Sequence, residues 1–579
     1  MRHVLWMSGL LACLAFPAVS GAAEAEPDSL AGKPVVLDSS GKLLSWMRPQ
    51  ETAFSRTALT AWRFLETRVP IEANGLKTYF TYPGFSPVSK VAFNWLHHPA
   101  GLNAMLMETS LAIHAYTGDR SALDLPRSLM DYQLENGMTP ANWVWGNVPY
   151  SSSNPGETTF RGGDDIWACE NSVPCGRGDG LGVIEPDKVG ESGLAYLRLF
   201  LVTGEERYRQ TAIACANALA ANVRPGDELK SPWPMRVYAQ TGSVREEYGA
   251  NVIAPIRLFD ELIRLELGDW HAYLRTRQLA WDWMMRVPMR NNHWSGYFED
   301  IPIMSSPGEN LNQYIPLETA RYLLQHPEYD ADWRAHARQL LDFTERVFAA
   351  DTQGEKGNQW GANVLTEQLF FPFKMGSHTA RYASVAALWS DRTGDAQARE
   401  KAFRSFNWST YMNDGEGLVS TWAGEGDTWF TDGYGDYIRH YMSGLAAVPE
   451  WAPPGESHLL GTSSLVKDIS YGSEEISYTT VHAKATEVLR LDTRPGRVLA
   501  GGRELVLRKS LEGGQEGYTL RPLGDDFELR VHHVGSGAVR IDLRPGPAQN
   551  DGGCSATGGQ GAGVFALALL VLLGRRTRA

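Results

Sequence analysis

The stretch ESGLAYLRLFLVTGEERYRQTAIACANALA, residues 191–220, decides the fold class of this chain. Gly204 can adopt the left-handed backbone conformation that ends a helix, and Glu205 is favourable at the start of the next helix. On both sides of this turn, apolar residues recur at helical spacing. They are Leu194, Leu197 and Leu201 before the turn and Tyr208, Ala212, Cys215 and Leu219 after it. The stretch therefore predicts two helices joined as a tight hairpin.

The same kind of turn recurs through the middle of the chain. Glycine followed by an acidic residue separates helical patterns at Gly118, Gly268 and Gly394, and Pro327 replaces glycine in a fifth turn. Two helical patterns, at about 52–68 and 434–447, have no partner next to them in the sequence. Paired with each other, they would make a sixth hairpin and close a ring.

Twelve helices in six hairpins resemble the six-hairpin glycosidase-like superfamily, over residues 51–450. The resemblance rests on the helix count and the turn pattern, and it implies an (α/α)6 toroid. An open α-solenoid is the alternative, because its hairpins repeat in a similar way. The links between the hairpins are long and irregular here, which favours the toroid.

A period of two replaces the helical period after the last predicted helix. Phe527, Leu529 and Val531 alternate with polar residues, and the pattern repeats at 539–543. Glycine-containing turns fall roughly 10–12 residues apart, as in all-β domains. The sequence thus predicts a mainly α protein with a smaller β-sandwich-like domain at 455–545.

Both ends of the chain have the pattern of targeting segments. Residues 1–23 hold an apolar run followed by small residues, which predicts a secretory signal peptide; a lipobox ending at Cys13 is the alternative. An N-terminal extension, 24–50, follows. Residues 546–579 contain a Gly-rich spacer, Cys554, a short apolar run and terminal arginines, and resemble the myxobacterial C-terminal sorting signal. That resemblance implies anchoring at the outer surface of a Gram-negative bacterium, with membrane contact only through this segment.

Charge and aromatic content point to the class of ligand. The formal net charge of −13 argues against nucleic acid, because phosphate binding needs a basic surface. The chain has 19 Trp, and many of them lie in the long links, where functional residues concentrate. Planar aromatic faces can stack on sugar rings. The expected sugar-binding residues are Trp143, Trp145, Trp167, His293, Trp294, Trp360, Trp422, Trp429 and Tyr434.

Hydrolysis of a glycosidic bond needs two carboxyl groups, one acting as acid and the other as base or nucleophile. The first long link carries Asp164 and Asp165, and the last one carries Glu425 and Asp432, with Asp436 close behind. These two links flank the hairpin that closes the ring. We therefore expect their carboxyl groups to face each other across one end of it and to be catalytic.

Other acidic residues and one histidine receive structural interpretations. Asp187 is predicted to be the N-cap of the helix that follows it, and Glu246 to be solvated. His378 begins a helix and is predicted to be a structural group with satisfied hydrogen bonds.

The remaining predictions concern a disulfide and metal ions. Cys169 and Cys175 bracket a short loop and are predicted disulfide partners in an oxidising compartment. No cofactor is expected. Calcium bound by Asp164, Asp165 and Asp179 is the alternative, although their spacing matches no EF-hand loop.

Together these patterns favour a secreted, cell-surface enzyme that cleaves a polysaccharide or oligosaccharide, with hydrolysis by paired carboxyl groups preferred. A polysaccharide lyase or a uronate epimerase is one alternative, because a Tyr/His pair can carry out proton transfer. The other is a non-catalytic glycan-binding or surface-assembly protein, since a fold alone does not determine a function. In every case the expected partner is a carbohydrate.

Overall fold

The computed structural model describes residues 29–544, except 74, 78–83, 86–97, 155, 165–166, 169–173, 177, 299–300, 302, 350–357 and 421–428. The predicted signal peptide and the predicted sorting segment with Cys554 lie outside the described residues, so both remain predictions. Within the described part of the chain, no helix is long and apolar enough to cross a membrane.

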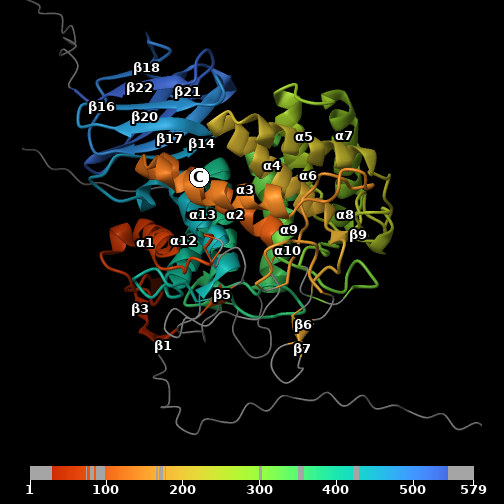
Figure 1. Cartoon of the computed structure of the whole chain (residues 1–579). Coiled ribbons are helices and arrows are strands. Elements are labelled where there is room, and N and C mark those ends of the chain that lie inside the picture. The colour runs from red at the N-terminus through yellow and green to blue at the C-terminus, as the bar shows by residue number, and fades with distance from the viewer. Residues whose placement is uncertain are drawn as a thin grey trace, which may run out of the picture.

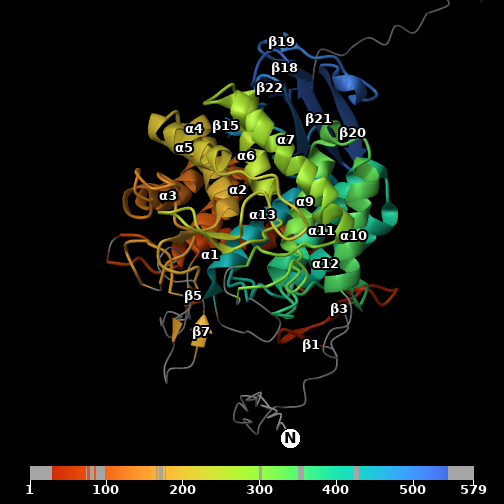
Figure 2. The ribbon, with the colours of Figure 1, turned by 90° about the vertical axis from the view of Figure 1, so that its right-hand side faces the viewer.

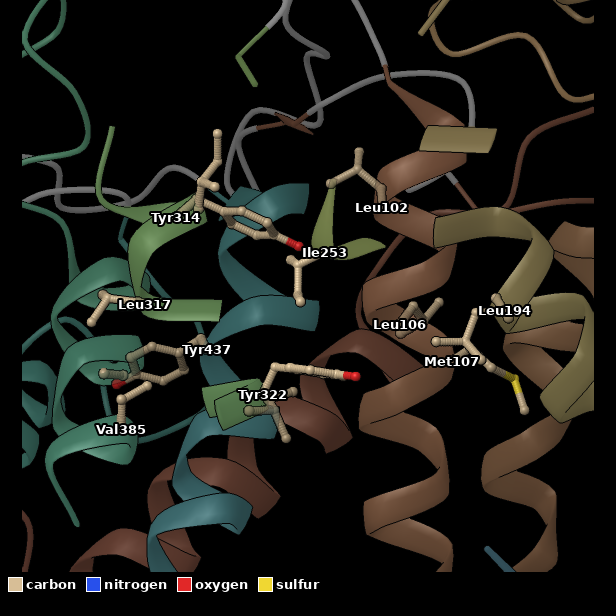
Figure 3. Close-up of a cluster of buried hydrophobic side chains, with 14 of the residues drawn as sticks. Leu102, Leu106, Met107, Leu194, Ile253, Tyr314, Leu317, Tyr322, Val385 and Tyr437 are labelled. Carbon is tan, nitrogen blue, oxygen red and sulfur yellow. The ribbon is translucent and has the colours of Figure 1, made fainter. Parts of the chain in front are cut away.

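Six helices form a closed inner ring. Each contacts its neighbours on both sides, and the last of them contacts the first. They are α2 (Pro99–Thr117), α4 (Pro186–Thr203), α6 (Ile253–Arg264), α9 (Tyr314–Gln325), α11 (Gly376–Thr393) and α13 (Thr431–Ala447). Buried side chains from all six helices gather in the cluster of Figure 3. This closure confirms the predicted toroid and excludes the open solenoid.

An outer helix packs against each inner helix. The outer helices are α1 (Ala53–Thr67) on α13, α3 (Asp124–Asn136) on α2, α5 (Glu206–Ala221) on α4, α7 (Trp270–Arg286) on α6, α10 (Trp333–Phe348) on α9 and α12 (Ala396–Thr410) on α11. The short helix α8 (Pro288–Asn291) follows α7. The contact between α1 and α13 confirms that the two unpaired helical patterns form the sixth hairpin.

The hairpin turns have the predicted chemistry. Gly118, Gly204 and Gly394 end inner helices in the left-handed conformation, with φ of 77°, 77° and 79°. The side chains of Asp269 and Asp395 accept hydrogen bonds from backbone N–H groups of the next helix. These residues position helices and are not part of a site.

Helices α4 and α6 meet closely at Gly190. A Cβ atom there would lie 2.6 Å from the backbone nitrogen of Pro255, which cannot swing aside as a side chain could. We expect Gly190→Ala to lower the free energy of unfolding by roughly 1–3 kcal/mol, the typical cost of overpacking. Chemical denaturation measures this change. Gly535→Ala, where a Cβ atom meets nothing within 4 Å, is the matched control; equal stability of both variants would contradict the prediction.

Two antiparallel sheets form the C-terminal domain, with strand orders β14-β17-β21-β20 and β15-β16-β22-β18-β19. Leu489 and Leu529 of the first sheet share a core with Ile476 and Ile541 of the second, which confirms the predicted sandwich. The strands are β14 (His458–Thr462), β15 (Val466–Tyr471), β16 (Glu475–Thr480), β17 (Ala485–Leu491), β18 (Arg497–Ala500), β19 (Arg503–Glu504), β20 (Gly517–Leu523), β21 (Asp526–His533) and β22 (Ala538–Asp542).

The sandwich covers the end of the ring where the inner helices end. Strand β14 contacts α2 and α13, and the ring of His458 stacks on Tyr116 with centroids 4.0 Å apart. Figures 1 and 2 show the sandwich at one end of the helices and the links at the opposite end. That opposite end, where the inner helices begin, is called the mouth below. Among the described residues, the sandwich lies over the end of the ring opposite the mouth.

Short strands lie before the ring and within its links. At the N-terminal extension, Arg404 of α12 donates a hydrogen bond of 2.9 Å to the carbonyl of Leu43. The short strands are β1 (Ser29–Leu30), β2 (Lys33–Pro34), β3 (Val36–Leu37), β4 (Leu43–Leu44), β5 (Gly84–Phe85), β6 (Trp167–Ala168), β7 (Pro174–Gly176), β8 (Val183–Ile184), β9 (Arg236–Tyr238), β10 (Val244–Glu246), β11 (Asn358–Gln359), β12 (Ala362–Asn363) and β13 (Trp429–Phe430). The extension is therefore attached to the toroid by hydrogen bonds.

Candidate functional site

A cavity lies on the axis of the ring, lined by residues of α2, α4, α6, α9 and α13. Its volume is about 20 Å³, and it opens to solvent. Its polar lining residues are Glu108, Glu191, Arg198, Arg257, Tyr314 and Arg439. We call it the axial cavity. Glu108, Arg198 and Arg257 keep 21%, 20% and 24% of their side-chain surface exposed although they belong to inner helices. Apolar packing therefore does not fill the axis at this level.

Glu108 is the centre of an ion-pair network in the axial cavity. Arg198 Nη1 and Arg257 Nη2 each donate to its Oε1 at 2.6 Å, and Arg439 Nη1 donates to its Oε2 at 2.5 Å. Burial by itself raises the pKa of this carboxyl group. The guanidinium groups of Arg257, Arg198 and Arg439 outweigh burial and hold the pKa well below its usual range. Glu108 is therefore an ionised group that cannot serve as a proton donor.

Asp436, a candidate carboxylate from the sequence, lies next to this network. Its Oδ1 accepts hydrogen bonds from Arg439 Nη2 at 2.7 Å, and His440 Nε2 lies 3.0 Å from the same oxygen. Arg381 pairs with its other oxygen. Burial raises the pKa of Asp436, but Arg381, His440 and Arg439 outweigh burial and hold it well below its usual range. Asp436 therefore binds cationic side chains of the ring itself.

Glu191 differs from these carboxylates because it forms no ion pair within the described residues. Its Oε1 accepts hydrogen bonds from Tyr314 at 3.1 Å and from the Asn251 amide at 3.2 Å. Its buried Oε2 has no hydrogen-bond partner in the described part of the chain. Burial raises the pKa of Glu191, and nearby Asp187 raises it further, while Lys188 opposes them. A carboxyl group in this state retains its proton at higher pH and can act as a general acid.

A second carboxyl group, Asp187, lies one helical turn before Glu191. Its Oδ2 accepts a hydrogen bond of 3.0 Å from Asn251 Nδ2, the same nitrogen that contacts Glu191. Asp187 and Asn251 also line a second cavity, of about 10 Å³, together with Trp233 and Met235. One amide thus bridges two carboxyl groups that line two different cavities. The N-cap prediction for Asp187 is wrong, because the N-cap position is Glu185.

Two stacked tyrosines form a wall beside these carboxyl groups. The rings of Tyr297 and Tyr314 lie 3.8 Å apart at an angle of 14°, and Lys188 Nζ lies 3.3 Å from the centroid of Tyr297. Burial raises the pKa of the Tyr314 hydroxyl, so it keeps its proton and donates a hydrogen bond to Glu191. The wall holds the Glu191 carboxyl group in one orientation.

His378 begins α11 near the mouth and is buried. Its Nε2 has no hydrogen-bond partner in the described residues, and its Nδ1 lies 3.2 Å from Arg381 Nη1. Burial lowers the pKa of His378 to about 3, and Arg381 contributes in the same direction. The ring is therefore neutral at ordinary pH, and Nε2 carries a lone pair that can accept a hydrogen bond. The prediction that its hydrogen bonds are satisfied is wrong for Nε2.

The structure corrects three of the predicted sugar-binding residues. Trp145 and Trp294 are 1% and 0% exposed and belong to the hydrophobic core of the toroid. Tyr434 is also wholly buried, and its hydroxyl donates a hydrogen bond of 2.9 Å to the carbonyl of Gly417. These side chains have no free face for a sugar because the links fold back onto the helices and their aromatics fill the core. Trp143, His293 and Trp360 are partly buried.

Most of the predicted catalytic residues cannot be placed. Asp164 is half-buried, and its backbone N–H donates a hydrogen bond of 2.8 Å to Asn154 Oδ1. Residues wholly outside the described part are Asp165, Cys169, Trp422 and Glu425, and the side chains of Trp167, Cys175, Trp429 and Asp432 are outside it as well. The catalytic pairing across the mouth and the Cys169–Cys175 disulfide therefore remain predictions.

Asp179, one of the calcium ligands considered from the sequence, forms an ion pair with an arginine. Arg236 Nε donates to its Oδ1 at 2.9 Å, and Arg236 also pairs with Glu246, which is buried where the sequence predicted a solvated residue. No group of three or more His, Cys, Asp or Glu side chains in the described residues could hold a metal ion. The buried arginine ties the first long link to β9 and β10, and so shapes the mouth.

Glu185, next to this cluster, should make stability depend on pH. Burial and the nearby carboxylate of Asp179 raise the pKa of Glu185 well above its usual value of 4.5. Its contribution to stability is thus fully present below that value and is lost as pH rises through the folded-state pKa. Glu185→Gln, which cannot ionise, should gain in melting temperature relative to the wild type as pH rises from about 5 to 8. A difference that stays constant over this range would contradict the prediction; Glu135→Gln is the surface control.

Exposed aromatic surface occurs at the mouth in a place that the sequence reasoning did not single out. Leu369, Phe370 and Phe373 are 42%, 48% and 47% exposed. Phe370 N–H donates to Asn310 Oδ1 at 2.9 Å, which attaches this loop to the segment leading into α9. This loop is rich in phenylalanine and has no tryptophan, so the tryptophan pattern does not indicate it, although exposed apolar surface of this kind marks binding sites.

The cavity residues were missed for a different reason. Glu108, Glu191, Arg198 and Arg257 occur inside helical patterns, where charged residues are usually taken as solvent-facing. A signal was present in α4, because Arg198 follows Leu194 at the spacing that puts both on one helix face. Both residues line the axial cavity.

Neither a known protein family nor a curated protein sequence matches this chain. Several solved structures are similar to it. Cellobiose 2-epimerase from Spirochaeta thermophila DSM 6192 matches 68% of this chain and 96% of its own, at 12% identity and a TM-score of 0.49. A D-mannose isomerase matches the same shares at 12% identity and a TM-score of 0.47. A GH76 α-mannanase from Bacteroides thetaiotaomicron matches 68% and 95%, at 12% identity and a TM-score of 0.40. These similarities assign neither an activity nor a residue role to this chain, whose toroid is established by its own helix contacts.

Proposed function

We propose that this protein is a carbohydrate-active enzyme that hydrolyses a polysaccharide or oligosaccharide, with Glu191 as its general acid. One observation carries the proposal. Glu191 lines the axial cavity, one of its carboxyl oxygens has no hydrogen-bond partner among the described residues, and burial raises its pKa. Asp187, held by the same Asn251 amide, supplies the second carboxyl group that hydrolysis requires.

In the proposed reaction, Glu191 donates its proton to the glycosidic oxygen as the bond to the anomeric carbon breaks. Asp187 takes a proton from the water that attacks that carbon. Tyr314 and Asn251 keep the Glu191 carboxyl group in place through their hydrogen bonds to Oε1. The exposed loop with Phe370 and Phe373 would contact sugar units outside the cavity.

A lyase or an epimerase is the second candidate, and His378 is the observation in its favour. Its neutral imidazole lies near the mouth, and its Nε2 has no hydrogen-bond partner among the described residues. An imidazole in this position could take a proton from a carbon next to a carboxylate if a bound anionic sugar raised its pKa. In that case cleavage leaves an unsaturated sugar, or the sugar changes configuration without cleavage.

Incubation of the purified protein with a panel of polysaccharides separates these candidates. New reducing ends without ultraviolet absorbance support hydrolysis, and absorbance from unsaturated ends supports the lyase. A changed sugar composition without cleavage supports the epimerase. Retention on a glycan column with no product from any polymer would leave a binding protein and overturn the enzymatic proposal.

We also propose that the protein acts outside the cytoplasm, at the cell surface. The support is the pattern of residues 1–23 and of residues 546–579 with Cys554. Mass spectrometry of the protein from the cell-surface fraction should find an N-terminus after residue 23 and processing near Cys554. An intact N-terminus in the mature protein would contradict this proposal.

A further inference from the structure

We propose that the axial cavity binds an anionic substituent of the sugar, so that the ligand is an acidic glycan bearing uronate carboxylates or sulfate esters. The choice of a sugar rests on the proposed function. The anion site itself rests on the charges that surround the ring axis.

Arginines outnumber the carboxylates that pair with them around the axis. Within the described residues, the network joins Arg198, Arg257, Arg321, Arg381 and Arg439 to Glu108, Glu318 and Asp436. Burial raises the pKa of Glu318, but Arg321, Arg439 and Arg381 outweigh burial and lower it to about 2, so this carboxyl group is ionised. Five cations thus face three anions, which leaves two positive charges.

The carboxylate of Glu261 also acts electrostatically on Arg198, but it is already paired with Arg264. Burial raises the pKa of Glu191, which favours the neutral form of this carboxyl group. His378 and His440 are neutral, because burial lowers the pKa of each to about 3. Charge without a partner is costly in a buried site. A bound anion would supply the missing negative charge.

Arg198 and Arg257 are the residues that would bind this anion. Each has a single hydrogen-bond partner in the described residues, Oε1 of Glu108, and each is partly exposed to the axial cavity. A guanidinium group has five N–H donors and matches a carboxylate or sulfate in a bidentate geometry. By contrast, Arg439 binds Glu108, Glu318 and Asp436 and is only 7% exposed. Arg321 and Arg381 each have an Nε group without a hydrogen-bond partner among the described residues, but these groups are buried. Arg198 and Arg257 are the arginines of this network that line the axial cavity with most of their N–H donors unused.

The position of these donors relates the anion to the reacting bond. Arg198, Arg257 and Glu191 line the same cavity. A sugar whose acidic group pairs with the two arginines would lie beside Glu191. The whole chain carries a net charge of −13 and would repel an acidic polymer, so attraction has to come from this local cluster. Binding should therefore depend on these particular arginines.

The first experiment uses small probes and needs no turnover. At constant ionic strength, glucuronate should raise the melting temperature of the wild-type protein, whereas glucose at the same concentration should not. Arg257→Gln should weaken glucuronate binding at least ~10-fold, and Arg198→Gln should act in the same direction. Arg275→Gln, on the exposed face of α7, should leave binding unchanged. Stabilisation by inorganic sulfate but not by glucuronate would assign the site to sulfated sugars.

If an arginine substitution impairs folding, Glu108→Gln provides a second test of the anion site that leaves both arginines in place. This change removes a negative charge from the cavity and should tighten glucuronate binding in every folded preparation. Equal stabilisation by glucose and glucuronate would overturn the inference, as would unchanged binding in both arginine variants.

The second experiment uses a polyuronate and the same polymer after chemical reduction of its carboxyl groups. The native polymer should be retained by the protein and the reduced polymer should not. Equal retention of both polymers would overturn the anion site.

The two proposals can fail separately. If the protein cleaves a neutral polysaccharide and Glu191→Gln abolishes this cleavage, the enzymatic proposal is supported and the anion site is contradicted. If Arg257→Gln abolishes glucuronate binding but the wild type releases no product from any polymer, the anion site is supported and the enzymatic proposal is contradicted.

Discussion

Glu191→Gln should lower kcat on the glycan substrate about 10²–10⁴-fold while leaving the fold and the binding of the substrate intact. The amide has the shape of the carboxyl group and can still accept hydrogen bonds from Tyr314 and Asn251. It cannot donate a proton to a leaving oxygen. Initial rates of product release, together with the melting temperature, measure the effect.

The pH dependence of the wild type offers an independent check on the role of Glu191. Because burial raises the pKa of this group and the acid form is the active one, kcat/KM should fall as pH rises through that pKa. Glu135→Gln, a change of the same kind on the exposed surface of α3, should be as active as the wild type. Full activity of Glu191→Gln, with activity lost in Asp165→Asn or Asp432→Asn, would return catalysis to the carboxylates predicted from the sequence.

Glu108→Leu should lower the free energy of unfolding by about 3–5 kcal/mol, the usual cost of removing one partner from a buried ion pair. The substitution leaves Arg198, Arg257 and Arg439 close together without the carboxylate that joins them. Glu108 is 21% exposed, so water in the cavity will screen part of the repulsion and the lower end of the range is expected. Denaturant titration measures the loss.

The sign of the pH effect distinguishes this mechanism from a loss of packing. The pKa of Glu108 is held far below its unfolded value, so its stabilisation is present above that value and is lost as pH falls. The difference between the wild type and Glu108→Leu should therefore shrink in acid. A difference that is independent of pH would mean that the arginines do not need this carboxylate. Glu135→Leu should change stability by no more than roughly 0.5 kcal/mol.

The helical hairpins could be predicted because their causes are local. Gly204 ends α4 because glycine tolerates a positive φ, and Asp395 begins α12 because its side chain accepts backbone hydrogen bonds. Such interactions involve neighbours in the sequence, so the spacing of a few residue types indicates them. Ring closure could also be predicted, because the unpaired helix at each end of the toroid needs a partner that covers its apolar face.

The candidate site could not be predicted in the same way. Trp294 and Tyr434 lie in or next to long links, which suggested exposed faces, yet both are wholly buried. Glu191 and Arg257 lie in ordinary helical patterns, yet they line the axial cavity. Whether a link folds inward, and which helix face meets the axis, depends on contacts between segments far apart in the chain.

The sequence by itself determined the toroid, the sandwich and the order of the hairpins, because the spacing of apolar residues, the caps and the turn residues fix where each element begins and ends. Only the tertiary structure decided which carboxyl groups have arginine partners and which has none. Glu108 and Glu191 are the same residue type on two inner helices, and their pKa values shift in opposite directions. The difference arises because three guanidinium groups from other helices reach Glu108, whereas Glu191 meets a tyrosine and an amide.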